Sequence, residues 1–239
     1  MIEAEKQKRL ARLNAEIGTD PANWSKTCLV PYPPWVDKEI DKLIRAVKKI
    51  NAGQKAEAKK ILRSIHGKEM TEWYENVGQW TGAYRRNLLN SKKLKEIPKS
   101  HRASSNISLE MQMKVIKRDN YRCRYCQIRL IHKNEIITLQ NKFGRKMIPI
   151  CKESKNEREY AVTFRHGIIN MCQATYDHVK PLQLGGRSSV GNLVATCKAC
   201  NYGKGKFSLK ELSLNQPRKW QIIVDEWQGL ADLLNSKKS

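Results

Sequence analysis

Two short cysteine motifs, with residues 127–196 between them, constrain the fold of this chain more than any other feature. They are Cys123-Arg-Tyr-Cys126 and Cys197-Lys-Ala-Cys200. Two CxxC pairs supply four thiolates, the full ligand set of a closed tetrahedral zinc site. The gap between them exceeds the roughly 15–20 residues of compact zinc modules, so an insertion must loop out. We expect a structural zinc site, with no part in catalysis, at Cys123, Cys126, Cys197 and Cys200.

The remaining cysteines, Cys28, Cys151 and Cys172, have no CxxC partner. The N-terminal residues are charged where a secretory signal is apolar, and no apolar run reaches the roughly 18 residues that span a bilayer. We therefore expect a cytoplasmic, reducing location without membrane contact, in which paired CxxC motifs indicate metal binding. Single cysteines of this kind are commonly small buried hydrophobes. A staple or metal site at Cys151 and Cys172 is the alternative.

The charge balance of the chain points to a polyanionic partner. Lys and Arg number 46 against 23 Asp and Glu, which leaves a formal net charge of +23 and a pI near 9.9. Such a balance favours nucleic acid as the partner. A merely soluble basic protein or an anionic membrane surface is the alternative, although the chain carries no lipidation signal.

Residues 1–105 read as a basic helical region that serves DNA binding or docking. Apolar periodicity predicts four helices, over residues 2–17, from Trp35 onward, around 58–65, and over 70–84. Asp37 is the candidate cap of the second helix. We interpret the aromatic stripe of the last helix as core rather than as a stacking platform. A basic linker over 85–102 is either a solvated connector or a strip of phosphate contacts. Its candidate DNA contacts are Arg85, Arg86, Lys92, Lys93 and Lys95.

The second half of the chain shows both helical and strand-like patterns. Ser108 is a candidate helix cap. Residues 135–139 and 160–164 are strand-like by their β-branched and aromatic content, and Leu193-Val194-Ala195 reads as a short strand or a helix start. Residues 216–239 read as an amphipathic helix behind Pro217.

Polar residues suited to phosphodiester chemistry lie between and directly after the cysteine motifs. Asp177 and His178 are adjacent, and Asn201 follows Cys200 directly. A zinc ion bound to both motifs would hold the Asp-His pair close to Asn201. Carboxylate and amide oxygens suit a hard cation, and an imidazole that is neutral near pH 7 suits a general base. These residues form a plausible centre for metal-dependent phosphodiester cleavage.

At this point the residues resemble the HNH endonuclease family. The resemblance covers about residues 108–208 and rests on Cys123-x-x-Cys126, Asp177-His178-Val-x-Pro181, Gly185-Gly186, Gly191-Asn192-Leu193 and Cys197-x-x-Cys200-Asn201-x-x-Lys204-Gly205. It implies an α+β fold with a ββα-metal core over 106–215 and an insertion at about 127–172. In that core a hairpin bears Asp177 and His178, and a helix bears Asn201. The third motif position, often His, is Asn201, which makes this an HNN variant.

The resemblance also implies the role of each residue. His178 would be the general base, while Asp177 and Asn201 would hold one Mg2+, for which Mn2+ would be able to substitute. Asn192 would fix the loop that orients His178, and Lys204 is a candidate phosphate contact. Adjacent residues on a strand point to opposite faces, so the strand must end or bend between Asp177 and His178 for both to act.

The resulting hypothesis is a metal-dependent endonuclease that hydrolyses DNA, expected to be double-stranded. Family analogy places such a protein in phage defence, restriction or a mobile element. One alternative is a nuclease subunit that acts only within a larger defence complex with protein partners. Another is a non-catalytic zinc-dependent DNA-binding protein, and a milder variant takes RNA as the substrate.

Overall fold

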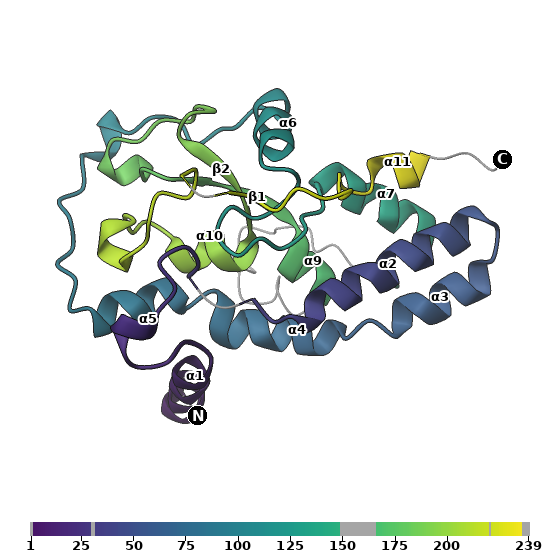
Figure 1. Cartoon of the computed structure of the whole chain (residues 1–239), viewed down its shortest axis with the longest axis horizontal. Coiled ribbons are helices and arrows are strands. Elements are labelled where there is room, and N and C mark those ends of the chain that lie inside the picture. The colour runs from purple at the N-terminus through teal and green to yellow at the C-terminus, as the bar shows by residue number, and fades with distance from the viewer. Residues whose placement is uncertain (1, 30–31, 149–165, 220, 236–239) are drawn as a thin grey trace.

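The computed structural model describes residues 2–29, 32–148, 166–219 and 221–235 (Figure 1). Within them the chain is mostly helical, with one two-stranded antiparallel sheet of β1 (Ala174–His178) and β2 (Leu193–Cys197). The register pairs Ala174 with Cys197 and His178 with Leu193. Helix α10 (Lys198–Lys204) follows β2 without a loop and packs against both strands. The α+β class and the hairpin-then-helix order predicted from the sequence are confirmed.

The N-terminal region supplies a layer of helices. Its elements are α1 (Ile2–Ile17), η1 (Pro21–Asn23), α2 (Trp35–Asn51), α3 (Lys55–Arg63), α4 (Gly67–Trp73), the π-helical turn η2 (Tyr74–Gly78), α5 (Thr81–Leu88) and η3 (Lys99–His101). Helix α2 buries Ile40, Leu43 and Val47, which share one face at helical spacing. It packs along α3, and the two lie side by side in Figure 1.

Two details of this region differ from the prediction. Helix α2 begins after Pro34, which makes no side-chain capping bond; Asp37 lies in the first turn and instead binds Arg129. The single helix expected over 70–84 is interrupted by η2, so its aromatic residues do not form one stripe. Most of them are nevertheless buried, whereas Trp80 is 37% exposed and lies under the Arg9 guanidinium.

The second half contains α6 (Leu109–Arg118), α7 (Lys133–Phe143), α9 (Gly167–Cys172), η4 (Leu182–Leu184), η5 (Lys210–Leu212) and α11 (Ala231–Asn235). Ser108 caps α6 as predicted, because its hydroxyl accepts a bond from Met111 N. The strand expected over 135–139 is wrong. A capping box between His132 and Glu135 starts α7 there, and local capping outweighs β-branched content. Residues 160–164 and Cys151 lie outside the described residues.

The C-terminal amphipathic helix is also wrong for most of its length. Among its described residues only α11 is helical, and residues 221–230 form an irregular segment that packs on the second half of the chain. Its apolar anchors Trp227 and Leu230 are buried. The Glu135 carboxylate accepts bonds from Leu230 N and Ala231 N at 3.0 and 3.1 Å. These two bonds pair the backbone N–H groups of Leu230 and Ala231, which would otherwise need hydrogen bonds within a helix.

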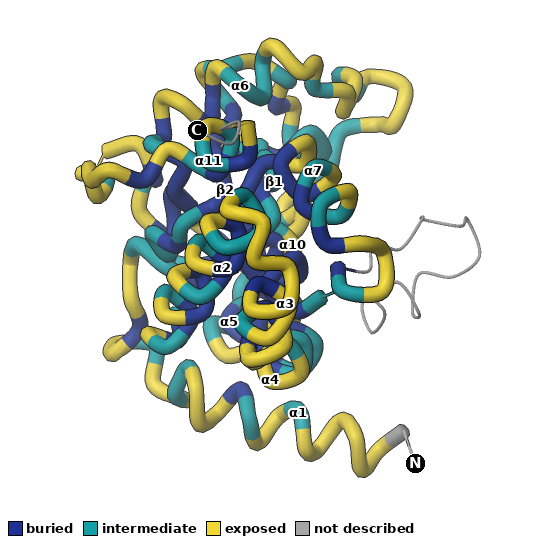
Figure 2. The backbone as a smooth tube through the Cα atoms, turned by 90° about the vertical axis from the view of Figure 1, so that its right-hand side faces the viewer, coloured by how far each residue is buried: buried dark blue, intermediate teal, exposed yellow. Residues whose placement is uncertain are grey.

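The N-terminal helices and the second half of the chain share one apolar core. Figure 2 shows buried residues, in dark blue, around β1, β2, α10 and the inner faces of the helices. Two glycine contacts bring the helices close together. A Cβ on Gly82 of α5 would lie 1.5 Å from the Gly203 carbonyl oxygen of α10, and a Cβ on Gly167 of α9 would lie 2.0 Å from the Gly67 carbonyl oxygen. Glycine therefore permits backbone contact where no side chain fits.

We predict that Gly82→Ala lowers the free energy of unfolding by about 1–3 kcal/mol, because the methyl group forces α5 away from α10. This loss exceeds the roughly 1 kcal/mol that alanine gains over glycine in a helix. Urea denaturation followed by circular dichroism measures it. The control is Gly191→Ala, whose new Cβ would meet its nearest atom at 3.9 Å. Equal denaturation midpoints for the two variants would contradict the close packing.

The half-buried His166 caps α9 and should make stability depend on pH. Its Nδ1 accepts a bond from Ile168 N, and burial lowers the pKa of His166 from 6.5 to about 4. As pH falls below 6.5 the unfolded chain binds this proton first, so the folded state loses stability until about pH 4. Because asparagine retains the cap, we expect His166→Asn to remove this part of the pH dependence. Thermal melts of both proteins from pH 7 to pH 4 test this, and parallel curves would refute it.

Candidate metal centre and active site

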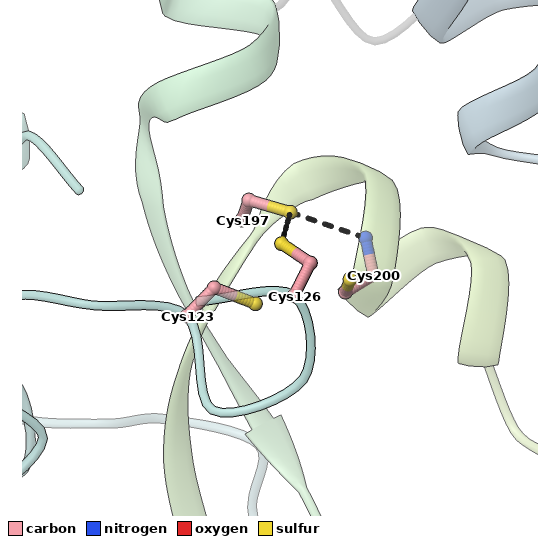
Figure 3. Close-up of side chains that lie close together, drawn as sticks. All are labelled: Cys123, Cys126, Cys197 and Cys200. Carbon is pink, nitrogen blue, oxygen red and sulfur yellow. Dashed lines mark hydrogen bonds between the residues drawn. The ribbon is translucent and has the colours of Figure 1, made fainter. Parts of the chain in front are cut away.

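The four cysteines of the two CxxC motifs come together in the folded chain (Figure 3). Their sulfur atoms all lie within 4.8 Å of one another, and Cys126 Sγ lies 3.7 Å from Cys197 Sγ. Neighbouring sulfurs of a tetrahedral zinc site lie about 3.8 Å apart, given zinc–sulfur bonds of about 2.3 Å. The donor set therefore fits a zinc ion, and its four ligands leave no position for a substrate.

Local backbone structure turns each pair of thiols toward this point. In the first motif Cys123 N bonds to Ile128 O, Gln127 N bonds to Cys123 O, and Gln127 adopts a positive φ of 64°. These bonds close a tight turn that presents both sulfurs on one side. In the second motif Cys197 ends β2 and is the N-cap of α10, where its sulfur accepts a bond from Cys200 N at 3.4 Å.

The electrostatics of this cluster favour a cation. Burial raises the pKa of the Cys123 thiol, but hydrogen bonds from Cys126, Cys197 and Cys200 outweigh it and lower that pKa well below its usual value. Hydrogen bonds to Cys123 raise the pKa of Cys200 and Cys197, and burial raises the pKa of Cys126. One thiolate is thus stabilised by the others, and deprotonation of all four requires a positive charge among them.

The segment that follows η1 packs over this cluster, which the sequence did not indicate. The Cys28 thiol contacts Cys200, and the partly buried Tyr32 side chain contacts Cys172. Arg85 holds this segment in place by donating bonds to the carbonyls of Ser25, Cys28 and Leu29 at 2.8–3.1 Å. The N-terminal region therefore forms part of the wall around the cysteines.

The predicted catalytic carboxylate, Asp177, is buried beneath α10. Its Oδ1 accepts a bond from Lys204 Nζ at 2.9 Å, and its Oδ2 accepts one from the Tyr125 hydroxyl at 2.7 Å. Lys204 Nζ also donates to His178 O at 3.0 Å, which ties α10 to the end of β1. Tyr125 lies inside the first CxxC motif, and no spacing in the sequence marked it as a partner of Asp177.

His178 is the last residue of β1, and its side chain is held by a chain of two serines. His178 Nε2 lies 2.9 Å from Ser188 Oγ, and Ser188 Oγ donates to Ser104 O at 2.7 Å. Because Ser188 donates its only hydroxyl hydrogen to the Ser104 carbonyl, the Ser188 oxygen must accept a hydrogen bond from His178 Nε2–H. This pattern leaves Nδ1 as the unprotonated, basic nitrogen. Burial lowers the pKa of His178; the Lys204 charge lowers it further, and the Asp177 charge partly raises it. The net lowering favours the neutral ring.

Two asparagines complete the candidate site. Asn192 Oδ1 accepts from Lys180 N at 2.8 Å, and its Nδ2 donates to Lys180 O and Arg187 O at 3.0 Å each. Such bonds fix the loop after His178. Asn201 lies three residues before Lys204 on α10, and residues at this spacing share a helix face. Asn201 is therefore on the side of α10 that meets Asp177.

The candidate DNA contacts are not all at the surface. Arg85 and Lys204 are 1% and 0% exposed and are engaged inside the protein, which corrects the expectation that these two side chains meet phosphates. Arg86 is 27% exposed, lies over the Phe207 ring and faces Glu211 at 3.7 Å. Lys92, Lys93 and Lys95 are exposed, and Lys93 pairs with Glu96 at 3.1 Å.

Comparison with known families agrees with this geometry. Residues 167–216, which contain the hairpin and α10, match the family model described as HNH endonuclease. This region is an HNH endonuclease domain. No curated protein and no solved structure matches the chain. At the level of the family the HNH domain is a nuclease, and a nucleic acid is its substrate.

The rest of the chain adds one finding about membranes. Among the helices of the described residues, none has both the length and the apolar character needed to cross a lipid bilayer.

We predict that the purified protein contains one zinc ion per chain and that Cys123→Ser loses it. The four thiolates then no longer close around the ion, so the turn of residues 123–128 detaches from β2 and α10 and the melting temperature falls. Elemental analysis and thermal melts measure both effects. Cys172→Ser is the matched control, since Cys172 is buried nearby but lies outside the four-cysteine cluster. Full zinc content in Cys123→Ser would disprove this ligand set.

Proposed function

We propose that this protein is a metal-dependent DNA endonuclease in which His178 is the general base. The observation that best supports the proposal is the chain from Ser104 through Ser188 to His178, which orients the ring and assigns its hydrogen to Nε2. A base that accepts a proton on Nδ1 at neutral pH is what water activation requires.

The chain's own residues account for the proton transfer. Hydrolysis of a phosphodiester needs a water that is deprotonated as it attacks phosphorus, in line with the leaving 3′ oxygen. Nδ1 of His178 takes that proton, and Ser188 stabilises the resulting imidazolium by accepting the Nε2–H bond. Asn192 keeps the backbone after His178 from shifting during this step.

Asp177 and Asn201 are the residues proposed to hold Mg2+. A carboxylate and an amide oxygen are the hard donors that this ion prefers. The Lys204 ammonium lies 2.9 Å from Asp177 Oδ1, and each carboxylate oxygen retains a second acceptor site that a cation would use. When bound, the ion would polarise the scissile phosphate and offset charge on the leaving oxygen. Lys204 would then share Asp177 with it and hold the carboxylate in place.

DNA is the proposed substrate class within the nucleic acids. The net charge of +23 supports binding to a phosphate backbone, and the exposed lysines of residues 92–95 are close in sequence to Ser104. A role in defence against phage, in restriction or in a mobile element remains a hypothesis from the resemblance.

We predict that the protein relaxes supercoiled plasmid in Mg2+ and that EDTA abolishes this activity. His178→Ala should lower the cleavage rate by about 10²–10⁴ without weakening DNA binding, because general-base catalysis is worth that much. Ser188→Ala should lower the cleavage rate less, because it removes the hydrogen bond that orients His178 but leaves the imidazole in place. Gel assays give the rates, and fluorescence anisotropy in EDTA gives the affinities.

The matched control is His66→Ala, whose side chain is 61% exposed at the start of α4 and far in sequence from the HNH domain. Parallel assays on single-stranded RNA test the substrate class. If His178→Ala cleaves as fast as the wild type, His178 is not the general base. If RNA is cleaved faster than DNA, DNA is not the preferred substrate.

A further inference from the structure

A cavity of about 580 Å³ opens beside the residues that directly follow His178. Its wall comes from three segments: the linker of residues 91–107, the loop after β1, and residues 208–216. Val179, Lys180 and Pro181 form the part nearest to the general base in sequence. The volume is within the range of small-molecule sites, which is about 300–1,000 Å³.

The lining combines an apolar surface with positive charge. Leu94, Ile97, Val179, Pro181, Leu184 and Leu209 supply the apolar part. Lys95, Lys180 and Lys210 are exposed at its edge, and none of them forms an ion pair with a described residue. Among the described residues the lining includes no acidic one, and Leu94 is 41% exposed. An exposed leucine among unpaired lysines suits a ligand with a flat apolar part and flanking negative charges.

The cavity wall is rigidly connected to the candidate catalytic loop. Asn192 binds both backbone groups of Lys180, and Val179 N donates to Asn192 O at 2.9 Å. In the linker, Ile97 N donates to Gln183 O at 2.8 Å, which fixes the linker against the loop. Anything bound in the cavity is thus held at a constant position relative to His178.

We propose that this cavity binds an unpaired base of the nucleic-acid substrate, next to the phosphate that is cut. The inference rests on the proposed function, because that function brings a phosphate to His178. The two faces of a base would lie against the leucines and Val179, and the three lysines would contact the phosphates on either side of it. A base inside a duplex is stacked and paired, so it reaches the cavity only at a cost. The preferred substrate is therefore DNA with an unpaired or mismatched nucleotide at the cleavage site.

The first test measures binding without cleavage. Two labelled DNA molecules are compared in EDTA by fluorescence anisotropy: a fully paired duplex, and the same duplex with one extra, unpaired 2-aminopurine. We expect the second to bind about tenfold more tightly, because the paired duplex must first unstack and unpair a base before that base can enter the cavity. Its 2-aminopurine emission should also change when protein is added, because the base leaves the helix stack for the cavity.

Substitutions then locate the effect. Leu94→Trp fills the cavity from the linker, and Leu209→Trp fills it from the segment of residues 208–216, so the test survives if one variant folds poorly. Both should bind the two DNA molecules with equal affinity. The control is Ile137→Trp, an addition of similar volume at a 43% exposed position on α7 outside the lining. A preference for the unpaired base that persists in both cavity variants would overturn the proposal.

Cleavage assays separate this proposal from the nuclease assignment. In Mg2+, cuts should map to the phosphate beside the unpaired nucleotide wherever it is placed in the duplex. Wild-type protein that cuts both DNA molecules equally well refutes the cavity proposal and leaves the nuclease intact. A preference for the unpaired base with no cutting in any divalent metal supports the binding site and refutes the nuclease.

Discussion

The four-thiol cluster is the constraint on which the rest of the structure depends. It joins a turn at residues 123–128 to the point where β2 becomes α10, and the same turn carries Tyr125, whose hydroxyl binds Asp177. Asp177 in turn binds Lys204 of α10. A zinc ion bound to these thiols would therefore fix the helix bearing Asn201 and the strand bearing His178 relative to each other, although it would take no part in the reaction.

The buried pair of Asp177 and Lys204 gives the site a second organising feature. An isolated carboxylate beneath α10 would be costly, and the ammonium at 2.9 Å offsets that cost. The lysine thus neutralises Asp177 beside the position at which we propose that a cation binds. Its role in this fold is internal, which explains why a basic residue near a candidate nuclease site does not have to meet the substrate.

The sequence predicted the cysteine cluster and the hairpin followed by a helix better than it predicted the surrounding fold. Cysteine spacing and the order of Asp177, His178 and Asn201 indicated a zinc-stabilised hairpin and helix, because the chemistry of those residue types limits where they can lie. The strand expected at 135–139 failed because a capping box is a local signal that outweighs β-branched content. The helix expected near the C-terminus failed because distant partners bind this segment: the Trp227 indole donates to Tyr121 O, and Leu230 N and Ala231 N donate to Glu135. Tyr125, Ser188 and the Cys28 segment had no sequence signal, since their partners are distant in the chain.

The bond between Ser188 and the Ser104 carbonyl bears on how modular this nuclease domain is. The family match begins at residue 167, and a boundary near residue 106 looks natural from the sequence. Ser104 nevertheless lies before that boundary, and its carbonyl is the group that determines which nitrogen of His178 carries the hydrogen. A domain cut at residue 106 and transferred to another protein would keep every motif residue and lose the orientation of its base. The functional unit is therefore larger than the unit that the motif defines.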